Sequence, residues 1–368
     1  CIHCTRCVRF ATEIAGVPEL GAIGRGEDMQ ITTYLEQSVQ SELSGNVIDL
    51  CPVGALTSKP YVFEARPWEL KKTETIDVMD AVGSNIRVDT YGWEVKRVLP
   101  RINEEINEEW ISDKTRYACD GLKNQRLDIP YIKINNKFDK ISWSESYKKI
   151  FNKISETSSD KIAGITGDMT NMETLFIIKE FFEKTIKSKN LDSRSQNYYV
   201  NSEDRMNYIF NSKIEGLEKS DLIILIGSNP RLEATILNLR IRKSYIKNKT
   251  EIFSLGNIGD LTYPYNVLEN NTRIIRDIVN NKHELSKKII NAKKPSIIIG
   301  QSVLKLKSSI YIFEELKKFL YENNKINDEW NSLNILSKNA STVGSYDLDI
   351  LNSNNGMNIT LDKIKKNQ

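Results

Sequence analysis

Four of the five cysteines are spaced to ligate one metal centre. Cys1, Cys4 and Cys7 follow a Cys-x2-Cys-x2-Cys spacing, and the distant Cys51 is followed directly by a proline. This combination is typical of ferredoxin-like 4Fe–4S sites, in which one tight loop supplies three thiolates and its backbone amides point toward the sulfurs. The spacing therefore predicts a single 4Fe–4S cluster bound by Cys1, Cys4, Cys7 and Cys51.

Two other uses of these cysteines stay open at this point. A structural zinc site also takes four cysteines, but usually as two separated Cys-x2-Cys pairs. A disulfide framework needs a far higher density than 5 cysteines in 368 residues. The pattern favours the cluster over both. Cys119 has no cysteine near it in the sequence, and we expect it to be a small buried side chain.

Several charged residues flank the cysteine run. Arg6, Arg9 and Arg25 either offset the negative charge of a cluster or are simply solvated, and His3 is either a donor to a cluster sulfur or a loop residue. The only other histidine, His283, lies in a polar run and is expected at the surface. Because catalytic Ser-His-Asp and Cys-His units need histidine, we predict no catalytic residue on this chain.

Composition excludes two broad classes of function. Lys and Arg number 52 and Asp and Glu 49, a net charge of +3 without a dense basic stripe, so nucleic-acid binding is not expected. The longest aliphatic runs, at 222–226 and 297–299, are far shorter than the ~20 residues of a membrane span. Membrane association is therefore expected only through partners. The chain starts with a cysteine and shows no signal or transit peptide pattern, which suggests a processed product or a fragment.

The elements that must hold the cysteines are short. The spacing of apolar residues predicts helices at 7–15 and 45–50, with a hairpin-like stretch at 24–34 between them. Alternating apolar and polar residues predict a small β-rich unit with strands at 75–79, 86–91 and 93–99. The stretch 110–127 is expected to be helical toward its end, before Pro130.

From Ser142 onward the pattern changes to alternating strands and helices. Ser142 and Glu145 form a capping-box pattern for a helix that runs to about residue 154. Strands are predicted at 161–165, 221–226, 252–255 and 296–299, and helices at 172–186, 232–246, 273–290 and 304–321. Alternation of this kind indicates a parallel α/β sheet, and about 150 residues per domain gives two or three domains.

Several stretches resemble the large iron–sulfur subunit of respiratory complex I and its counterpart in the bacterial NADH dehydrogenases. The resemblance is most specific over the first 130 residues, at 1–10, 42–46, 51–57, 65–70, 111–117 and 120–123. Farther along, residues 226–234 are similar to the Gly-x-Asn-Pro turn of the molybdopterin oxidoreductase fold. In molybdopterin enzymes this turn helps to hold a pterin, whereas complex I subunits lack that cofactor.

The resemblance implies a fold of class α/β in three parts. Residues 1–70 would form the 4Fe–4S segment, 71–135 a β-rich unit, and 136–368 an incomplete molybdopterin-oxidoreductase-like parallel α/β domain without cofactor. Family members also carry a 2Fe–2S cluster and a further 4Fe–4S cluster in a preceding part of the chain. The ligands for those two clusters are not in this polypeptide.

Some relatives carry another 4Fe–4S site, with Cys-x2-Cys-x3-Cys and a fourth cysteine about 27 residues later. That spacing falls on Asp77, Asp80, Ser84 and Ser112 in this sequence. Hard oxygen ligands do not suit a cluster that binds soft thiolates. We therefore interpret the site as vestigial, and the β-rich unit as retained for packing.

By this resemblance the chain is an electron-transfer subunit of proton-pumping NADH:ubiquinone oxidoreductase, without a complete active site of its own. No Gly-x-Gly-x-x-Gly or phosphate-binding loop follows a strand, so NADH would be oxidised on another chain. The implied partners are the flavin subunit, the downstream iron–sulfur subunits and other peripheral-arm subunits. The implied location is the matrix side of the mitochondrial inner membrane, or the cytoplasmic side in a related bacterium. The alternative is a molybdopterin-dependent, formate-dehydrogenase-like enzyme, but this sequence shows no convincing ligand for the molybdenum.

Overall fold

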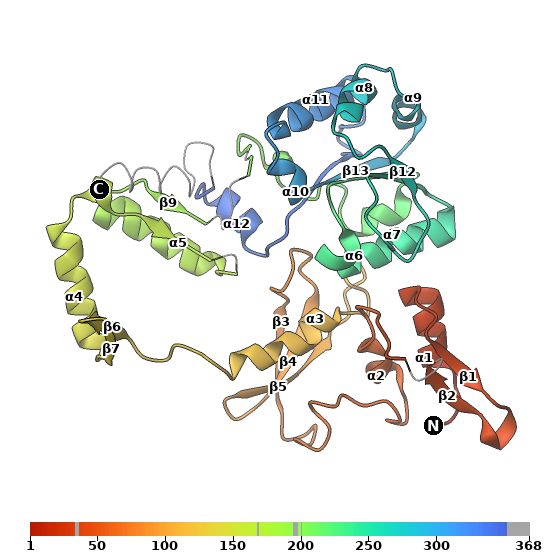
Figure 1. Cartoon of the computed structure of the whole chain (residues 1–368), viewed down its shortest axis with the longest axis horizontal. Coiled ribbons are helices and arrows are strands. Elements are labelled where there is room, and N and C mark those ends of the chain that lie inside the picture. Colours follow the sequence, from red (N-terminus) through yellow and green to blue (C-terminus); the bar gives the residue numbers. More distant parts are fainter. Residues whose placement is uncertain (34–36, 168, 194–197, 200, 352–368) are drawn as a thin grey trace. The chain divides into compact units, whose positions relative to one another are not determined.

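The chain is described by a computed structural model over residues 1–33, 37–167, 169–193, 198–199 and 201–351 (Figure 1). It divides into two compact units, one of residues 1–119 and 203–340 and the other of residues 120–202 and 341–368. Tyr34, at the end of the expected hairpin, and residues 352–368, at the end of the expected α/β domain, lie outside the described residues. The division at residues 70 and 135 stays a prediction.

A five-stranded parallel sheet forms the centre of the first unit. Strand β10 (Leu222–Ile226) lies between β11 (Glu251–Leu255) and β13 (Pro295–Gly300), with β12 (Asn266–Leu268) and β14 (Leu333–Leu336) at the edges. The residues of β10 and β13 are buried throughout, as expected for strands covered on both faces. This confirms the predicted parallel α/β sheet.

Helices of this sheet follow the predicted ranges with breaks. The predicted helix at 273–290 is two helices separated at Asn280–His283, and the one at 304–321 is interrupted after Leu304. The elements are α6 (Pro230–Glu233), α7 (Thr235–Asn248), α8 (Arg273–Val279), α9 (Glu284–Asn291), α10 (Gln301–Leu304) and α11 (Ser309–Glu322), with the 3-10 turns η7 (Arg205–Asn207) and η8 (Glu215–Lys219).

The cysteine-bearing segment packs on the same core. Phe10 and Leu43 join the cluster of buried side chains that contains Leu225 of β10 and Ile241 of α7. Both predicted short helices are confirmed, although the second half of the first is a π-turn, and the hairpin starts four residues earlier than predicted. The elements are α1 (Arg6–Arg9), η1 (Phe10–Ala15), β1 (Leu20–Ile23), η2 (Gly26–Asp28), β2 (Gln30–Thr33) and α2 (Asn46–Leu50).

The predicted β-rich unit is a three-stranded antiparallel sheet of β3 (Lys71–Ile76), β4 (Asn85–Tyr91) and β5 (Glu94–Pro100), and its first strand starts four residues earlier than predicted and ends before residue 77. The expectation for 110–127 is wrong in its placement of the helix. Ser112 accepts a hydrogen bond from the Thr115 amide and so starts α3 (Asp113–Tyr117) early, and the 3-10 turn η4 (Ala118–Leu122) ends it. The residues between η4 and Pro130 are not helical, and the proline disfavours the helical conformation at residue 129.

The second unit is built around two longer helices. The Ser142 capping box is confirmed, and its helix runs to Glu156. The predicted strand at 161–165 is reduced to Gly164–Ile165 and pairs with β9 instead of joining the five-stranded sheet. The elements are β6 (Tyr131–Ile134), β7 (Lys137–Lys140), α4 (Trp143–Glu156), η5 (Ser159–Lys161), β8 (Gly164–Ile165), α5 (Met172–Glu180), η6 (Phe181–Ile186), β9 (Leu191–Asp192) and α12 (Thr342–Asp347).

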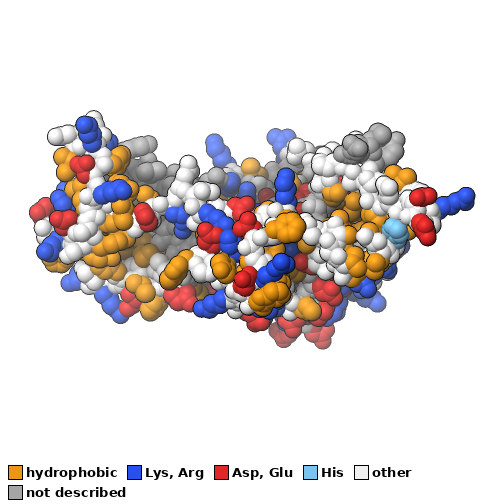
Figure 2. All heavy atoms as spheres, turned by 90° about the horizontal axis from the view of Figure 1, so that it is seen from below, with side chains coloured by type: hydrophobic (Ala, Val, Ile, Leu, Met, Phe, Trp, Pro, Cys, Tyr) orange, Lys and Arg blue, Asp and Glu red, His pale blue; other side chains and the backbone are white. Residues whose placement is uncertain are grey.

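Two surface expectations are addressed by the structure. Within the described part of the chain, no helix combines the length and the apolar character needed to cross a bilayer. Figure 2 shows Lys and Arg side chains interspersed with Asp and Glu over the face in view, without a continuous basic stripe. That distribution agrees with the small net charge of +3.

Candidate functional site

The first three cysteines lie in a tight turn that leads into α1. Cys1 is exposed, Cys4 and Cys7 are half-buried, and Cys7 belongs to the helix. His3 and Thr5 adopt positive φ angles of 52° and 58°, a conformation that is rare for residues other than glycine and most unusual for a β-branched one. The turn brings the His3 backbone amide to 3.4 Å from the Cys1 sulfur, to which it donates. His3 therefore supplies its main chain to a sulfur, as the ferredoxin-like pattern requires.

Cys51 stands at the carboxyl end of α2 and is half-buried. The pKa of its thiol is lowered, mainly because the Leu56 amide hydrogen-bonds to the sulfur, with further lowering by the amides of Val53, Ala55 and Gly54 against an opposing effect of burial. Gly54 has a φ of 64°, which lets the chain curl around the sulfur. A thiol in a cradle of amides is prepared to act as a thiolate ligand.

Helix α1, which contains Cys7, is in contact with α2, which ends directly before Cys51. All five cysteines are free thiols. Among the described residues, no three Cys, His, Asp or Glu side chains form a group that could hold a metal ion. A 4Fe–4S cluster is held by four cysteine thiolates, and each bonds a different iron, so its ligands do not converge on one point. The soft donors and the amide cradles fit such a cluster in their chemistry.

The structure also gives the exposure of the three arginines near the cysteine run, of Cys119 and of His283. Arg6, Arg9 and Arg25 are all exposed, which matches the interpretation that they are solvated. Cys119 is half-buried, not buried as expected, and packs beside the small apolar cluster of the β-rich unit. His283 is half-buried too, and its Nδ1 accepts from the Leu285 amide at 3.1 Å as the N-cap of α9. The expectation of a solvated histidine is therefore wrong.

The positions of the interpreted vestigial site lie inside the protein. Asp77, Asp80, Ser84 and Ser112 are each at most 5% exposed. The Asp77 carboxylate accepts from the Thr115 hydroxyl at 2.9 Å, and that hydroxyl also bonds the Ser112 hydroxyl at 2.9 Å. The Asp77 amide donates to the Ser84 carbonyl at 2.8 Å. The region is thus held by a buried polar network.

Burial disfavours the ionised form of two carboxyl groups in this region, those of Asp77 and Asp80. Desolvation raises the pKa of Asp80 to about 6, with the amide of Val82 and the Lys114 charge lowering it and Asp77 raising it. Desolvation also raises the pKa of Asp77, against the hydrogen bond from Thr115. Both carboxyl groups are buried and have raised pKa values, so they are part of the packed interior, in agreement with the packing role expected from the sequence.

The Gly-x-Asn-Pro turn serves as a strand-to-helix connection. Asn229 caps α6 by accepting from the Leu232 amide at 3.3 Å. Gly227 has a φ of 60°, and a Cβ added at Gly300 would lie 2.2 Å from the Gly227 carbonyl oxygen. Ligands of open α/β sheets bind beyond the carboxyl ends of the strands where the strand order reverses. In this sheet the strand order reverses between β10 and β13, and there the backbones that follow the two strands lie against each other.

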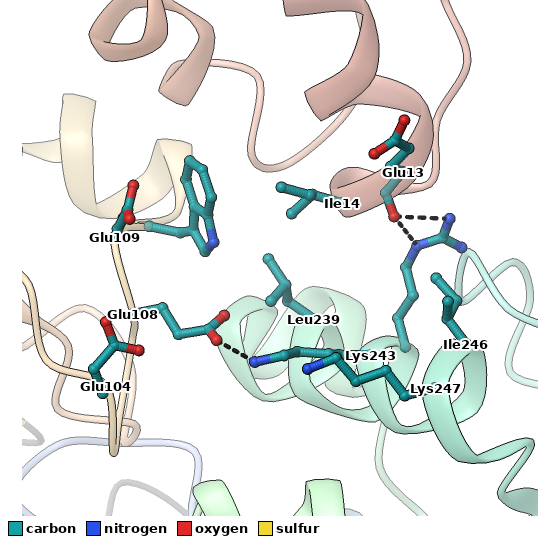
Figure 3. Close-up of a pocket in the computed structure, with 11 residues that line it drawn as sticks. Glu13, Ile14, Glu104, Glu108, Glu109, Leu239, Lys243, Ile246 and Lys247 are labelled. Atoms are coloured by element: carbon teal, nitrogen blue, oxygen red, sulfur yellow. Dashed lines mark hydrogen bonds and ion pairs between the residues drawn. The ribbon is translucent and has the colours of Figure 1, made fainter. Parts of the chain in front are cut away.

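A cavity of about 420 Å³ lies elsewhere in the first unit, between η1, the loop after β5 and α7 (Figure 3). Its apolar wall includes Ile14, Trp110 and Leu239. Figure 3 shows Lys243 bonded to Glu108. Arg242, which also lines the cavity, donates to the Glu13 backbone carbonyl. The lining contains neither a thiol nor an imidazole. It therefore takes no part in the cysteine site.

Comparison with protein families connects each part of the chain to a known module. Residues 126–368 match the molybdopterin oxidoreductase family. Residues 1–57 match the ferredoxin-like domain of NADH-quinone oxidoreductase subunit 3. Residues 70–120 match the 4Fe–4S domain of the NDSU1/NuoG-like NADH-ubiquinone oxidoreductases. That last stretch contains one cysteine, Cys119, so it cannot supply the four thiolates of a cluster by itself.

Individual relatives agree with these matches. The chain is 47% identical to the NADH-ubiquinone oxidoreductase 75 kDa subunit of Reclinomonas americana, over 95% of this chain and 52% of the relative. It is 48% identical to the mitochondrial 78 kDa subunit of Candida albicans, over 95% and 49%. It is 46% identical to a NADH-quinone oxidoreductase subunit of the bacterium Rickettsia prowazekii, over 95% and 51%. The chain thus spans about half the length of the curated relatives it matches.

Proposed function

Because the chain belongs to the molybdopterin oxidoreductase family and its first 120 residues match iron–sulfur modules of NADH-quinone oxidoreductase, we propose that it is an electron-transfer subunit of proton-pumping NADH:ubiquinone oxidoreductase. It is a homologue of the large iron–sulfur subunit of that complex. The proposed site is a 4Fe–4S cluster on Cys1, Cys4, Cys7 and Cys51. When bound, this cluster would carry one electron at a time from NADH oxidation toward quinone.

The observation that carries the proposal is the arrangement of the four thiols. The tight turn holds Cys1, Cys4 and Cys7 within seven residues, α2 ends directly before Cys51, and α1 and α2 are in contact. Backbone amides also lower the pKa of the Cys51 thiol. Amide donors stabilise negative charge on sulfur, so they favour ligation and influence the potential of whatever the thiolates bind. Phe10, three residues after Cys7, is buried and packs on Trp110 with ring centroids 4.9 Å apart, which anchors the end of this segment in the core.

The remaining parts of the chain act as a scaffold in this proposal. The sheet and the cysteine segment share one hydrophobic core, so the position of the site is tied to a rigid element. Partners would be the flavin subunit, the downstream iron–sulfur subunits and other peripheral-arm subunits. Association with the matrix side of the mitochondrial inner membrane, or with the cytoplasmic side in a bacterium, would come through the complex.

The test is metal and sulfide analysis of the purified chain with two cysteine variants. We expect about four irons and four acid-labile sulfides per chain, lost in Cys51→Ser and retained in Cys119→Ser, which removes the thiol outside the predicted set. A colourless zinc protein would overturn the proposal in favour of a structural metal site. Molybdenum or tungsten bound with a pterin would instead support the formate-dehydrogenase-like alternative.

A further inference from the structure

Helix α2 is too short to hold itself in place. It comprises five residues, Asn46–Leu50, and the next residue is Cys51. Isolated helices shorter than about 12 residues are marginal in water, and the N-cap of α2, Gly45, has no side chain with which to cap the helix. The position of Cys51 therefore depends on contacts that other parts of the chain make with α2.

Asp113, the first residue of α3, caps the start of α2. Its carboxylate accepts from the Ser44 hydroxyl at 2.5 Å and from the Gly45 backbone amide at 2.7 Å. The side chain thus satisfies an amide at the start of the helix in place of an N-cap side chain. The Asp113 amide donates to the Glu42 carbonyl at 2.8 Å, which secures the main chain just before that point.

The side chain of Arg116, in α3, hydrogen-bonds to residues of α2. The side chain is 5% exposed, and Nη2 and Nη1 donate to the two Asp49 carboxylate oxygens at 2.5 Å and 3.3 Å. Nη2 also donates to Oδ1 of Asn46 at 3.3 Å. Asn46 and Asp49 are three residues apart, so they lie on one face of the helix. One guanidinium therefore joins both ends of that face.

The fit between the two helices is close. A Cβ added at Gly45 would lie 2.7 Å from Cδ and from Nε of Arg116 and 2.9 Å from the Asp113 carboxylate. Asn46 is 1% exposed and pairs with the backbone of Ile111, donating to its carbonyl at 2.8 Å and accepting from its amide at 3.2 Å. The start, the inner face and the last turn of α2 are thus all held by residues 111–116.

We propose that Arg116 and Asp113 are positioning residues for the Cys51 thiolate, which fix α2 so that the fourth ligand meets the cluster. This inference rests on the proposed cluster site. Neither residue ligates iron. Arg116 acts through Asp49, two residues before Cys51, and Asp113 acts through the amide of Gly45. Residues that orient ligands typically contribute 10–100-fold to the affinity of a metal site.

The experiment uses the intact chain reconstituted with ferrous iron and sulfide. Iron per chain, the electron paramagnetic resonance spectrum after dithionite reduction, and the rate of iron release to a chelator are measured for wild type, Arg116→Met, Arg116→Lys and Asp113→Asn. We expect iron release to be roughly 10–100-fold faster in Arg116→Met, with shifted g values. Arg116→Lys should lie between, since lysine keeps the charge but not the planar fork.

Arg240→Met is the matched control. Arg240 is also an ion-paired buried arginine of the same compact unit, with a side chain 3% exposed and bonded to Glu108 and Glu218. It contacts neither α2 nor α3 in any described hydrogen bond or ion pair. A merely structural role for Arg116 would make both variants less stable and leave both cluster spectra unchanged.

The outcomes separate this inference from the proposed function. Iron release and spectra of Arg116→Met and Asp113→Asn that equal those of Arg240→Met would overturn the inference, while a cluster present in wild type would still support the proposed function. If Arg116→Met fails to fold, Asp113→Asn, which is isosteric, decides the question. Absence of iron in wild type, or a cluster retained in Cys51→Ser, would overturn the proposed site and this inference with it.

Discussion

Arg231 and Glu42, 189 positions apart in the sequence, form an ion pair in which Nε lies 2.9 and 3.0 Å from the two carboxylate oxygens. Arg231 follows the Gly-x-Asn-Pro turn, and Glu42 precedes α2 in the cysteine-bearing segment. The pair is largely shielded, with side chains 15% and 30% exposed. It therefore joins α6, the helix that follows β10, to the segment that leads into α2.

Removing this pair should destabilise the first unit. For Arg231→Met we expect a loss of about 2 kcal/mol in the free energy of unfolding, in the range of hydrogen bonds to charged groups. Urea denaturation of Arg231→Met, Glu42→Gln and the double variant measures the coupling. Single losses that simply add in the double variant would show that the two side chains do not interact. Lys219→Met, at a residue for which no ion pair is described, serves as the control.

Asp80 should make stability fall as the pH rises. Its pKa is about 6 in the folded protein against an ordinary value of 3.8. Between these values the folded state binds more protons than the unfolded state, so stability declines as pH rises through this window and stays low above pH 6. Asp80→Asn should then gain roughly 3 kcal/mol at pH 8, at 1.36 kcal/mol per unit of pKa difference, and little at pH 3.5. Denaturation curves at both pH values, with the exposed Asp328→Asn as control, test this. An equal gain at both pH values would contradict the assignment.

The hydroxyl of Thr115 should matter because it serves a buried carboxylate. Thr115→Val keeps the shape but removes the donor to Asp77, which leaves that carboxylate with one partner fewer. We expect a loss of about 1 to 3 kcal/mol in the free energy of unfolding. Thr90→Val is the comparison, since its hydroxyl makes a longer bond of 3.4 Å to the Lys71 carbonyl in an exposed position. Equal losses in the two variants would show that the buried hydrogen bond stabilises the protein no more than the exposed one.

Gly300 should tolerate no side chain. A Cβ there would lie 2.2 Å from the Gly227 carbonyl oxygen and 2.7 Å from Cβ of Ser228, so the ends of β10 and β13 would have to separate. We expect Gly300→Ala to cost about 1 to 3 kcal/mol or more. Gly21→Ala is the control, because nothing lies within 4 Å of a Cβ at that position. A thermal midpoint of Gly300→Ala that matches the control would mean that the two strand ends are not in contact.

Much of the fold was predictable because its signals are local. The capping box at Ser142, the short helix ahead of Cys51 and the buried strands β10, β11 and β13 depend on residues a few positions apart. One error falls where a distant segment decides, and others fall where a local cap was not recognised, as at Ser112. The strand at Gly164–Ile165 pairs with β9 and not with the main sheet. His283 caps a helix whose start depends on a break that periodicity does not mark.

The candidate site divides in the same way. The sequence by itself determined the four thiols, their spacing and the absence of cysteine at Asp77, Asp80, Ser84 and Ser112, because these are facts of residue type and order. Only the tertiary structure decided which side chains serve them. The bonds of Arg116 to Asp49 and of Thr115 to Asp77 join residues 67 and 38 positions apart. No local pattern specifies such pairs, since they form only when packing brings separate elements together and burial makes an unpaired polar group costly.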